Sequence, residues 1–204
     1  MAFPAFFAQA PVLRLHDGLS QLLGATSDGI IEYHYADAVR LAGHSCPTVA
    51  GAWLCARTGL RALYGHEAIP ERGGIAVTLP EAEDAGVAGV IGQVLTLVTG
   101  AGGAGGFRGL AGRHARNGLL RYGDAGAGAL QLRRLDTGAA VAMELDASVV
   151  PAESGQREML GRILAGDDDP ALLQRFGQAW QDRVRRMLVE HADDPALVRV
   201  RRIG

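Results

Sequence analysis

His44 and Cys46 are the two side chains whose types and spacing most directly suggest chemistry. They lie two positions apart in the run Ala42-Gly43-His44-Ser45-Cys46-Pro47. An imidazole and a thiol in this arrangement can share a metal ion or act as a base and a nucleophile. The alternative without chemistry is that His44 caps a helix and Cys46 packs in the core. We refer to residues 42–47 as the motif.

The residues after the motif predict a helix that positions the thiol. Pro47 suits the first helical position, where its missing N–H costs nothing. Apolar side chains recur at helical spacing from Thr48 to Tyr64, and Gly65 is the expected C-terminal cap. Cys46 is therefore expected at the N-terminal end of a helix, where free amides and the helix dipole favour a thiolate.

A tight metal site needs three or four ligands, so the motif needs partners. His16 and His34 lie in the thirty residues before it and are the first candidates; the others are Asp37, Glu81 and Asp84. A thiolate with an imidazole suits zinc or another late transition metal better than magnesium or calcium. We therefore predict one zinc ion on His44 and Cys46, with a third ligand from the segment before the motif.

The motif resembles the hallmark of the FmdE-like family of formylmethanofuran dehydrogenase proteins, a His-Gly-His-x-Cys-Pro-Gly run that opens a helix. Gly43, His44, Cys46 and Pro47 match it, whereas Ala42 replaces the first His and Thr48 the last Gly. Weaker resemblance extends to residues 99–122 and 176–184, over roughly two thirds of the chain. It implies a metal-binding accessory or carrier protein in metal- or cofactor-linked metabolism, associated with molybdenum or tungsten formylmethanofuran dehydrogenases.

Two other functions are compatible with the same residues. One is a metalloenzyme for a small anionic substrate held by Arg108, Arg113 and His114; the other is a metal-free thiol-redox protein that uses Cys46. Residues 100–106 match G-x-G-x-x-G, but a dinucleotide site needs a strand before the glycines and a packed helix after them. The residues that follow are broken by further glycines, so we predict a loop here.

Composition restricts the partners and the compartment. The 204 residues carry a net charge of −2, and all 20 basic residues are arginine. No global field attracts nucleic acid or an anionic membrane, so neither is expected as a partner. No run of 18 apolar residues predicts a transmembrane helix, and no basic segment precedes the apolar N-terminus, so we predict a cytoplasmic protein. Cys46 and Cys55 are roughly 13 Å apart on one helix, too far for a disulfide.

The pattern of elements predicts a single α+β domain with a mostly antiparallel sheet packed against the central helix and a helical C-terminal segment. The helices are expected over 11–23, 37–41, 48–64, 87–98, 156–164 and from 170 onward, and the strands over 29–35, 74–79, 119–122, 129–135, 139–145 and 197–203. Asp136-Thr137-Gly138 predicts a hairpin turn.

We expect residues 1–150 to form the metal-binding α+β domain and residues 151–204 a helical extension packed on it. The helix that Asp169 and Pro170 begin carries a stripe of apolar residues: Leu172, Phe176, Trp180, Val184 and Leu188. This stripe and the apolar N-terminus offer more hydrophobic surface than one small sheet needs. We therefore predict a homodimer, with a small anionic ligand as a second possible partner.

Overall fold

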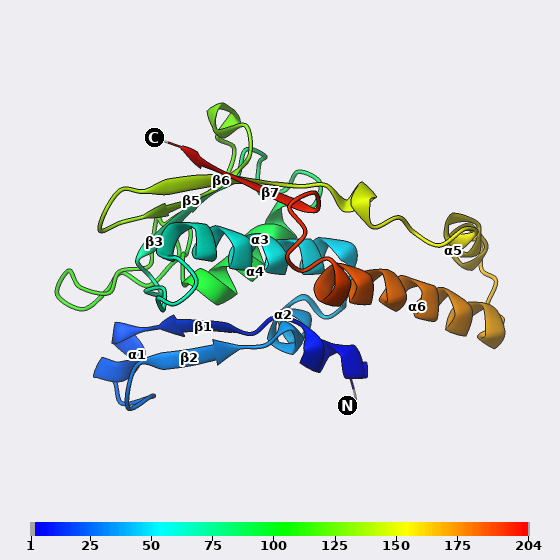
Figure 1. The fold of residues 1–204 in the computed structure, drawn as a ribbon, viewed down its shortest axis with the longest axis horizontal. Helices are drawn as coiled ribbons and strands as arrows, with labels where there is room; N and C mark the ends of the chain where they lie inside the picture. The colour runs from blue at the N-terminus through cyan, green and yellow to red at the C-terminus, as the bar shows by residue number, and fades with distance from the viewer. Residues whose placement is uncertain (1–2, 204) are drawn as a thin grey trace.

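Helix α3, Pro47–Tyr64, is the central element of the computed structural model, which describes residues 3–203. It lies between a five-stranded sheet and a two-stranded hairpin (Figure 1). The Cys46 sulfur accepts a hydrogen bond from the Val49 amide at the N-terminus, and Gly65, at φ 85°, ends the helix. The predicted helix, its cap and its position are confirmed.

The larger sheet has the strand order β4-β3-β5-β6-β7. All neighbours are antiparallel except β3 and β4. The strands are β3, Ile75–Thr78; β4, Leu120–Arg121; β5, Leu130–Arg134; β6, Ala140–Leu145; and β7, Val198–Ile203. The β5–β6 hairpin and the strand β7 agree with the sequence predictions. The fold is therefore a mostly antiparallel α+β unit.

The prediction of a helix over residues 11–23 is wrong, because this segment contains a strand of the smaller sheet followed by a short helix. The chain forms β1, Leu13–His16, and then α1, Gly18–Leu22; β1 pairs with β2, Ile30–Tyr33, in antiparallel fashion. Leu13 and Leu15 alternate with exposed Arg14 and are buried. Asp17 accepts hydrogen bonds from the amides of Leu19 and Ser20, so the helix begins only after it.

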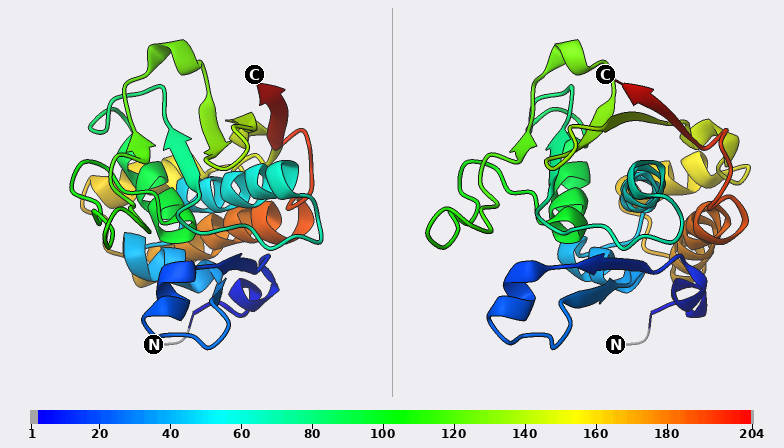
Figure 2. Two further views of the ribbon diagram at one scale, coloured as in Figure 1. Left: turned by 90° about the vertical axis from the view of Figure 1, so that its left-hand side faces the viewer. Right: turned by 60° about the vertical axis from the view of Figure 1, so that its left-hand side comes forward.

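Two helices and a loop complete the centre of the molecule. Helix α2, Tyr35–Ala42, leads into the motif, and α4, Ala88–Thr99, packs beside α3. The glycine-rich segment that follows α4 is a loop preceded by a helix, as Figure 2 shows, and not by the strand that a dinucleotide fingerprint needs. Short 3₁₀ turns cover Ala5–Gln9, Ala125–Ala127 and Ala147–Val149.

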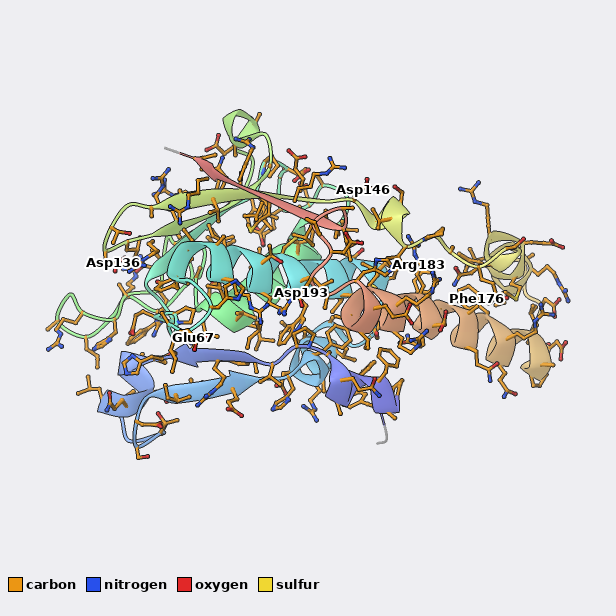
Figure 3. The ribbon with its side chains drawn as sticks, viewed as in Figure 1. Glu67, Asp136, Asp146, Phe176, Arg183 and Asp193 are labelled. Carbon is orange, nitrogen blue, oxygen red and sulfur yellow. The ribbon has the colours of Figure 1, made fainter. Side chains whose placement is uncertain are left out.

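The C-terminal helices form an arm that projects from the body (Figure 1). Helix α5, Gln156–Leu164, packs on α6, Pro170–Arg185, through a small cluster of Met159, Leu172 and Ala179. The end of α6 and the π-helical turn Arg186–Glu190 pack into the main core through Val184 and Leu188, respectively. Figure 3 shows Phe176 on the arm and Arg183 closer to the body, where Arg183 donates to the carbonyls of Ala147 and Val150. Within residues 3–203, no helix has both the length and the apolar character of a membrane span.

Candidate functional site

The motif is the short turn between α2 and α3. Gly43, at φ 75°, ends α2 in the left-handed region that glycine adopts most readily, and Cys46 is the N-cap of α3. His44 and Ser45 therefore lie between two helix ends, and the position of each is set by the hydrogen bonds it makes.

His44 is exposed, and one of its ring nitrogens is engaged. Its Nδ1 lies 2.9 Å from the Ala42 carbonyl oxygen. A carbonyl only accepts, so this contact places the proton on Nδ1 and leaves the Nε2 lone pair available. Metal-bound histidines characteristically donate their second ring N–H to a carbonyl or carboxylate. The ring is therefore in the tautomer that a metal ligand needs.

The two cysteines are both free and both buried. Cys46 is 8% exposed, and its sulfur accepts from the Val49 amide at 3.5 Å. Cys55 lies inside the core, where burial raises the pKa of its thiol to about 12. A thiol with so high a pKa is a poor nucleophile, so Cys55 acts as a small apolar core residue.

Ser45 is held by three side chains from distant parts of the chain. Trp180 Nε1 and Gln181 Nε2 donate to its carbonyl oxygen at 3.0 and 3.1 Å, and its hydroxyl is 3.0 Å from the Tyr35 hydroxyl. The Gln181 Oε1 atom is buried and has no hydrogen-bond partner among the described residues. Helix α6 thus fixes the backbone between His44 and Cys46, a contact that the sequence patterns did not predict.

The histidines considered as further ligands lie at opposite ends of the β1–β2 hairpin. His34 is exposed and directly precedes α2, and Asp37 accepts from its backbone amide at 2.9 Å. His16 pairs with Ile30, whereas Tyr33, next to His34, pairs with Leu13. Three residues of strand separate the two ends, about 10 Å at ~3.3 Å per residue. The hairpin therefore holds the two imidazoles apart.

Both ring nitrogens of His16 already have partners. Nδ1 lies 2.5 Å from Glu71 Oε2 and Nε2 lies 3.3 Å from Gln21 Oε1. The hydrogen bond to Glu71 raises the pKa of His16 against the opposing effect of burial. Within residues 3–203, no three His, Cys, Asp or Glu side chains are grouped so that they could hold a metal ion. At the motif, His44 and Cys46 are two positions apart in the chain, with His44 exposed and Cys46 buried.

A buried ion-pair cluster next to His16 was missed by the sequence patterns. Asp17 is 3% exposed, and it pairs with Arg72 and Arg116, each at 2.8 Å. Burial acts to raise the pKa of Asp17, but hydrogen bonds from Arg72 and the Ser20 amide, together with the Arg116 charge, outweigh it and lower the pKa. These residues are far apart in sequence, so local patterns gave no signal of the cluster.

The residues proposed for an anionic substrate lie on the loop after α4. Arg108 and Arg113 are exposed, and His114, at φ 58°, lies against Gly18. The loop contacts the end of β1 through Arg116 and Asp17, whereas the motif contacts α6 (Figure 1). Glu81 and Asp84 are exposed in the segment before α4.

Comparisons with known proteins give a distant structural likeness. No family model matches the chain, and no curated protein matches it. Among solved structures, the chain is similar to a tungsten formylmethanofuran dehydrogenase FmdE-like protein from Syntrophus aciditrophicus. The two are 16% identical, with a TM-score of 0.43, over 84% of this chain and 73% of that chain. This likeness concerns the chain trace alone.

Proposed function

We propose that this chain is an accessory protein that binds one transition-metal ion, with zinc as the expected metal, through His44 and Cys46. The observation that carries the proposal is the contact between His44 Nδ1 and the Ala42 carbonyl at 2.9 Å. It orients the imidazole so that Nε2 is the free donor atom, two residues from the thiol.

The donor atoms fit the proposed metal class. An imidazole nitrogen and a thiolate sulfur are ligands of zinc and other late transition metals and are poor ligands for magnesium or calcium. The Cys46 sulfur already accepts an N–H from Val49, an interaction that a thiolate strengthens. When bound, such an ion supplies Lewis acidity and a template for further ligands.

Two protein donors leave the proposed coordination sphere incomplete. Because the residues described include no cluster of three ligands, the remaining positions would be filled by water, a small molecule or another protein chain. Structural zinc sites normally have four protein ligands. An open site therefore favours a carrier or accessory role over a structural one, and this is also the role that the motif's resemblance to the FmdE-like family implies.

The test is the metal content of the full chain after loading with zinc and removal of excess metal. We expect one zinc per chain in the wild type and a loss of most of it in His44→Ala and Cys46→Ser. His66→Ala is the matched control, because His66 is exposed and lies beyond the far end of α3 from the motif. Stoichiometric zinc in both motif variants, or none in the wild type, overturns the proposal.

Two further variants locate any additional ligand. The sequence predicted that His34 or His16 completes the site, and this remains a prediction. Whichever of His34→Ala and His16→Ala removes an imidazole that moves to the ion should lower zinc affinity. Unchanged affinity in both variants would exclude these two imidazoles and leave Asp37, Glu81, Asp84 or groups outside the chain as the other ligands.

A further inference from the structure

The second half of α3 carries two arginines that share one carboxylate. Arg57 is 7% exposed; its Nη1 and Nη2 lie 2.7 and 3.1 Å from the two oxygens of Asp193. Arg61, one turn later, places its own Nη1 3.0 Å from Asp193 Oδ1. The carboxylate reaches both guanidinium groups from a surface turn before β7, and Asp193 itself is exposed.

Two guanidinium groups share the Asp193 carboxylate, and a second carboxylate, Glu67, lines the surface beside His66. The Arg57 guanidinium, followed by the charges of Arg61 and His66, lowers the pKa of Asp193. The neighbouring Asp194 is already paired with His191 at 2.8 Å. Nε and Nη2 of Arg61 have no hydrogen-bond partner within residues 3–203, and neither does the His66 ring. The Asp193 carboxylate therefore faces the guanidinium groups of Arg57 and Arg61 and has the His66 imidazole nearby.

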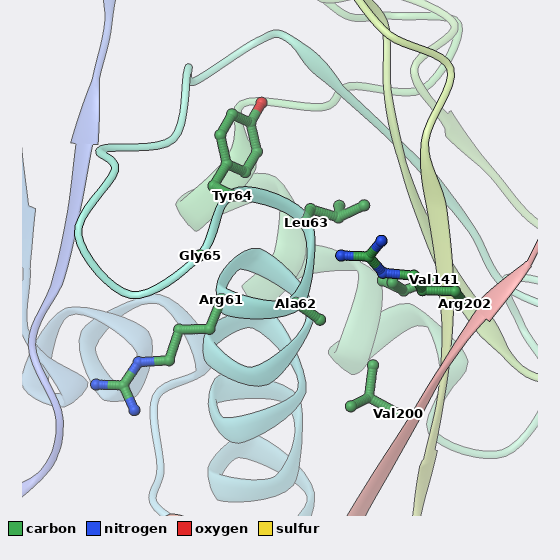
Figure 4. Close-up of a pocket in the computed structure, with 8 residues that line it drawn as sticks. All are labelled: Arg61, Ala62, Leu63, Tyr64, Gly65, Val141, Val200 and Arg202. Atoms are coloured by element: carbon green, nitrogen blue, oxygen red, sulfur yellow. The ribbon is translucent and has the colours of Figure 1, made fainter.

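These cationic groups lie between two hollows in the surface. A hollow of about 310 Å³ on one side and one of about 270 Å³ on the other are both lined by Arg57, Arg61 and His66. The larger of the two also has apolar walls, which include Leu60 and Ile69. A third hollow continues beyond Arg61 along Ala62 and Val200 toward Arg202 (Figure 4).

We propose that this surface binds a small organic phosphate, with the phosphate on Arg61 and His66 beside Asp193 and the apolar part against Leu60 and Ile69. Guanidinium donors match the oxygens of phosphate, and charge-assisted hydrogen bonds of this kind are the strong ones. A phosphate monoester carries close to two negative charges at neutral pH, and the guanidinium of Arg61 keeps two donor nitrogens, Nε and Nη2, without a partner in the described structure. The Asp193 carboxylate competes with the phosphate for Arg61, because it already accepts a hydrogen bond from Nη1 of this side chain.

The phosphate site is separate from the proposed metal site. The motif precedes the first residue of α3, whereas Arg57 and Arg61 lie in its second half. Ten residues of helix from Pro47 to Arg57 span about 15 Å at ~1.5 Å per residue. It is also separate from the loop of Arg108, Arg113 and His114, so it does not depend on the proposed metal function.

The experiment is calorimetric titration of the full chain at low salt with phenyl phosphate and with inorganic phosphate. We expect saturable binding of one phenyl phosphate per chain, roughly tenfold tighter than inorganic phosphate because the ring buries apolar surface. Arg61→Gln should weaken phenyl phosphate binding by roughly tenfold or more. Asp193→Asn should strengthen it, because the competing carboxylate is removed.

The loss of one arginine at a different place on the surface distinguishes a specific site from general attraction to positive charge. Arg40→Gln, which also removes one arginine from a pair with a carboxylate, is the control and should leave binding unchanged. The proposal is overturned if Arg61→Gln binds as the wild type does, if Asp193→Asn weakens binding, or if phenyl phosphate does not saturate the wild type. Should Arg61→Gln fail to fold, His66→Gln at the exposed His66 is the substitute, and unchanged binding there also overturns the proposal.

Discussion

Asp17 shows at the scale of single residues how one buried charge can hold three segments together. Its carboxylate accepts from the amides of Leu19 and Ser20 and pairs with Arg72 and Arg116. The Arg116 side chain lies directly over Gly73, where a β-carbon would collide with it. Gly73 is therefore glycine for a steric reason, in addition to its φ of 82°. The cluster fixes the loop after α4 against the end of β1.

The neighbouring His16–Glu71 pair gives a pH-dependent prediction. The hydrogen bond from Glu71 raises the pKa of His16 above its usual value of 6.5. The stabilisation is therefore fully present below the unfolded-state pKa and is lost as pH rises through the folded-state pKa. Glu71→Gln should lower the free energy of unfolding at pH 5.5 by less than about 1 kcal/mol, since both side chains are partly exposed. At pH 9 it should have little effect.

Urea denaturation at the two pH values measures this difference. Glutamine keeps the oxygen that accepts from the Gly18 amide, so the variant removes the charge and retains that hydrogen bond. Glu67→Gln, on the exposed segment after α3, is the control and should have no pH-dependent effect. A larger loss at pH 9 than at pH 5.5 would contradict the assignment of the raised pKa to Glu71.

At the scale of elements, glycines in α3 allow the sheet to approach the helix. A β-carbon on Gly51 would collide with Leu145 of β6, and one on Gly59 with Met143 of β6. Gly177 of α6 also lies in a helix, but apart from its chain neighbours and the nearby helix backbone no heavy atom lies within 4 Å of the position that its β-carbon would take. Glycine is therefore required for close packing in α3, whereas at Gly177 of α6 a larger side chain would fit.

We predict that Gly177→Ala raises the free energy of unfolding by about 0.5–1 kcal/mol, because alanine is the better helix former and nothing obstructs it. Gly51→Ala should instead lower it by about 1–3 kcal/mol, because overpacking outweighs helix propensity. Thermal or chemical unfolding of the two variants measures both signs. Stabilisation by Gly51→Ala would mean that α3 and β6 are less closely packed than described.

Elements set by local residues could be predicted, whereas those set by distant pairing could not. Residues Gln156–Leu164 and the Asp169–Pro170 helix start follow from caps and periodicity, and both are found. The prediction of a helix over residues 11–23 is wrong because the spacing of the leucines in this segment fits both the helical period and the strand period. A strand forms first, because Leu13 and Leu15 pair with β2, and a short helix follows, because Asp17 caps its N-terminus.

The candidate site also has features that local residues predict and others that depend on distant contacts. The position of Cys46 at a helix N-terminus follows from Pro47 and is observed. The hydrogen bond from Trp180 to Ser45 joins residues 135 positions apart, so no local pattern could predict it. The same holds for His16 and Glu71, which are 55 positions apart. Long-range contacts of this kind decide which side chains meet at a site.

The contact between α6 and the motif yields a prediction for the proposed metal. Gln181 Nε2 donates to the Ser45 carbonyl and helps fix the backbone between His44 and Cys46. Loss of contacts that orient metal ligands typically costs about 10–100-fold in affinity. Gln181→Ala should therefore weaken zinc binding by about tenfold in a chelator competition, while far-UV circular dichroism stays unchanged. Gln178→Ala, on the exposed side of the same helix, should bind zinc as the wild type does.

At the scale of the whole molecule, the projecting arm is where the predicted homodimer can be tested. Leu164 is 78% exposed and Leu173 is 43% exposed, on α5 and α6 respectively. Large apolar side chains left exposed on the arm can be buried by contact with another chain. The arm adds only the small cluster around Met159 to its own stability. Contact with a second copy would therefore stabilise the arm as well as bury these leucines.

We predict that the wild type is a dimer at micromolar concentration and that the double variant Leu164→Glu, Leu173→Glu is a monomer, because burying two carboxylates at an apolar contact is costly. Light scattering coupled to size exclusion measures both masses. Leu22→Glu, Leu23→Glu is the matched control: this pair is also exposed but lies at and just after the end of α1 on the small hairpin, and it should leave the dimer intact. A monomeric wild type rejects the dimer, whereas dissociation by the control pair alone moves the interface to the hairpin.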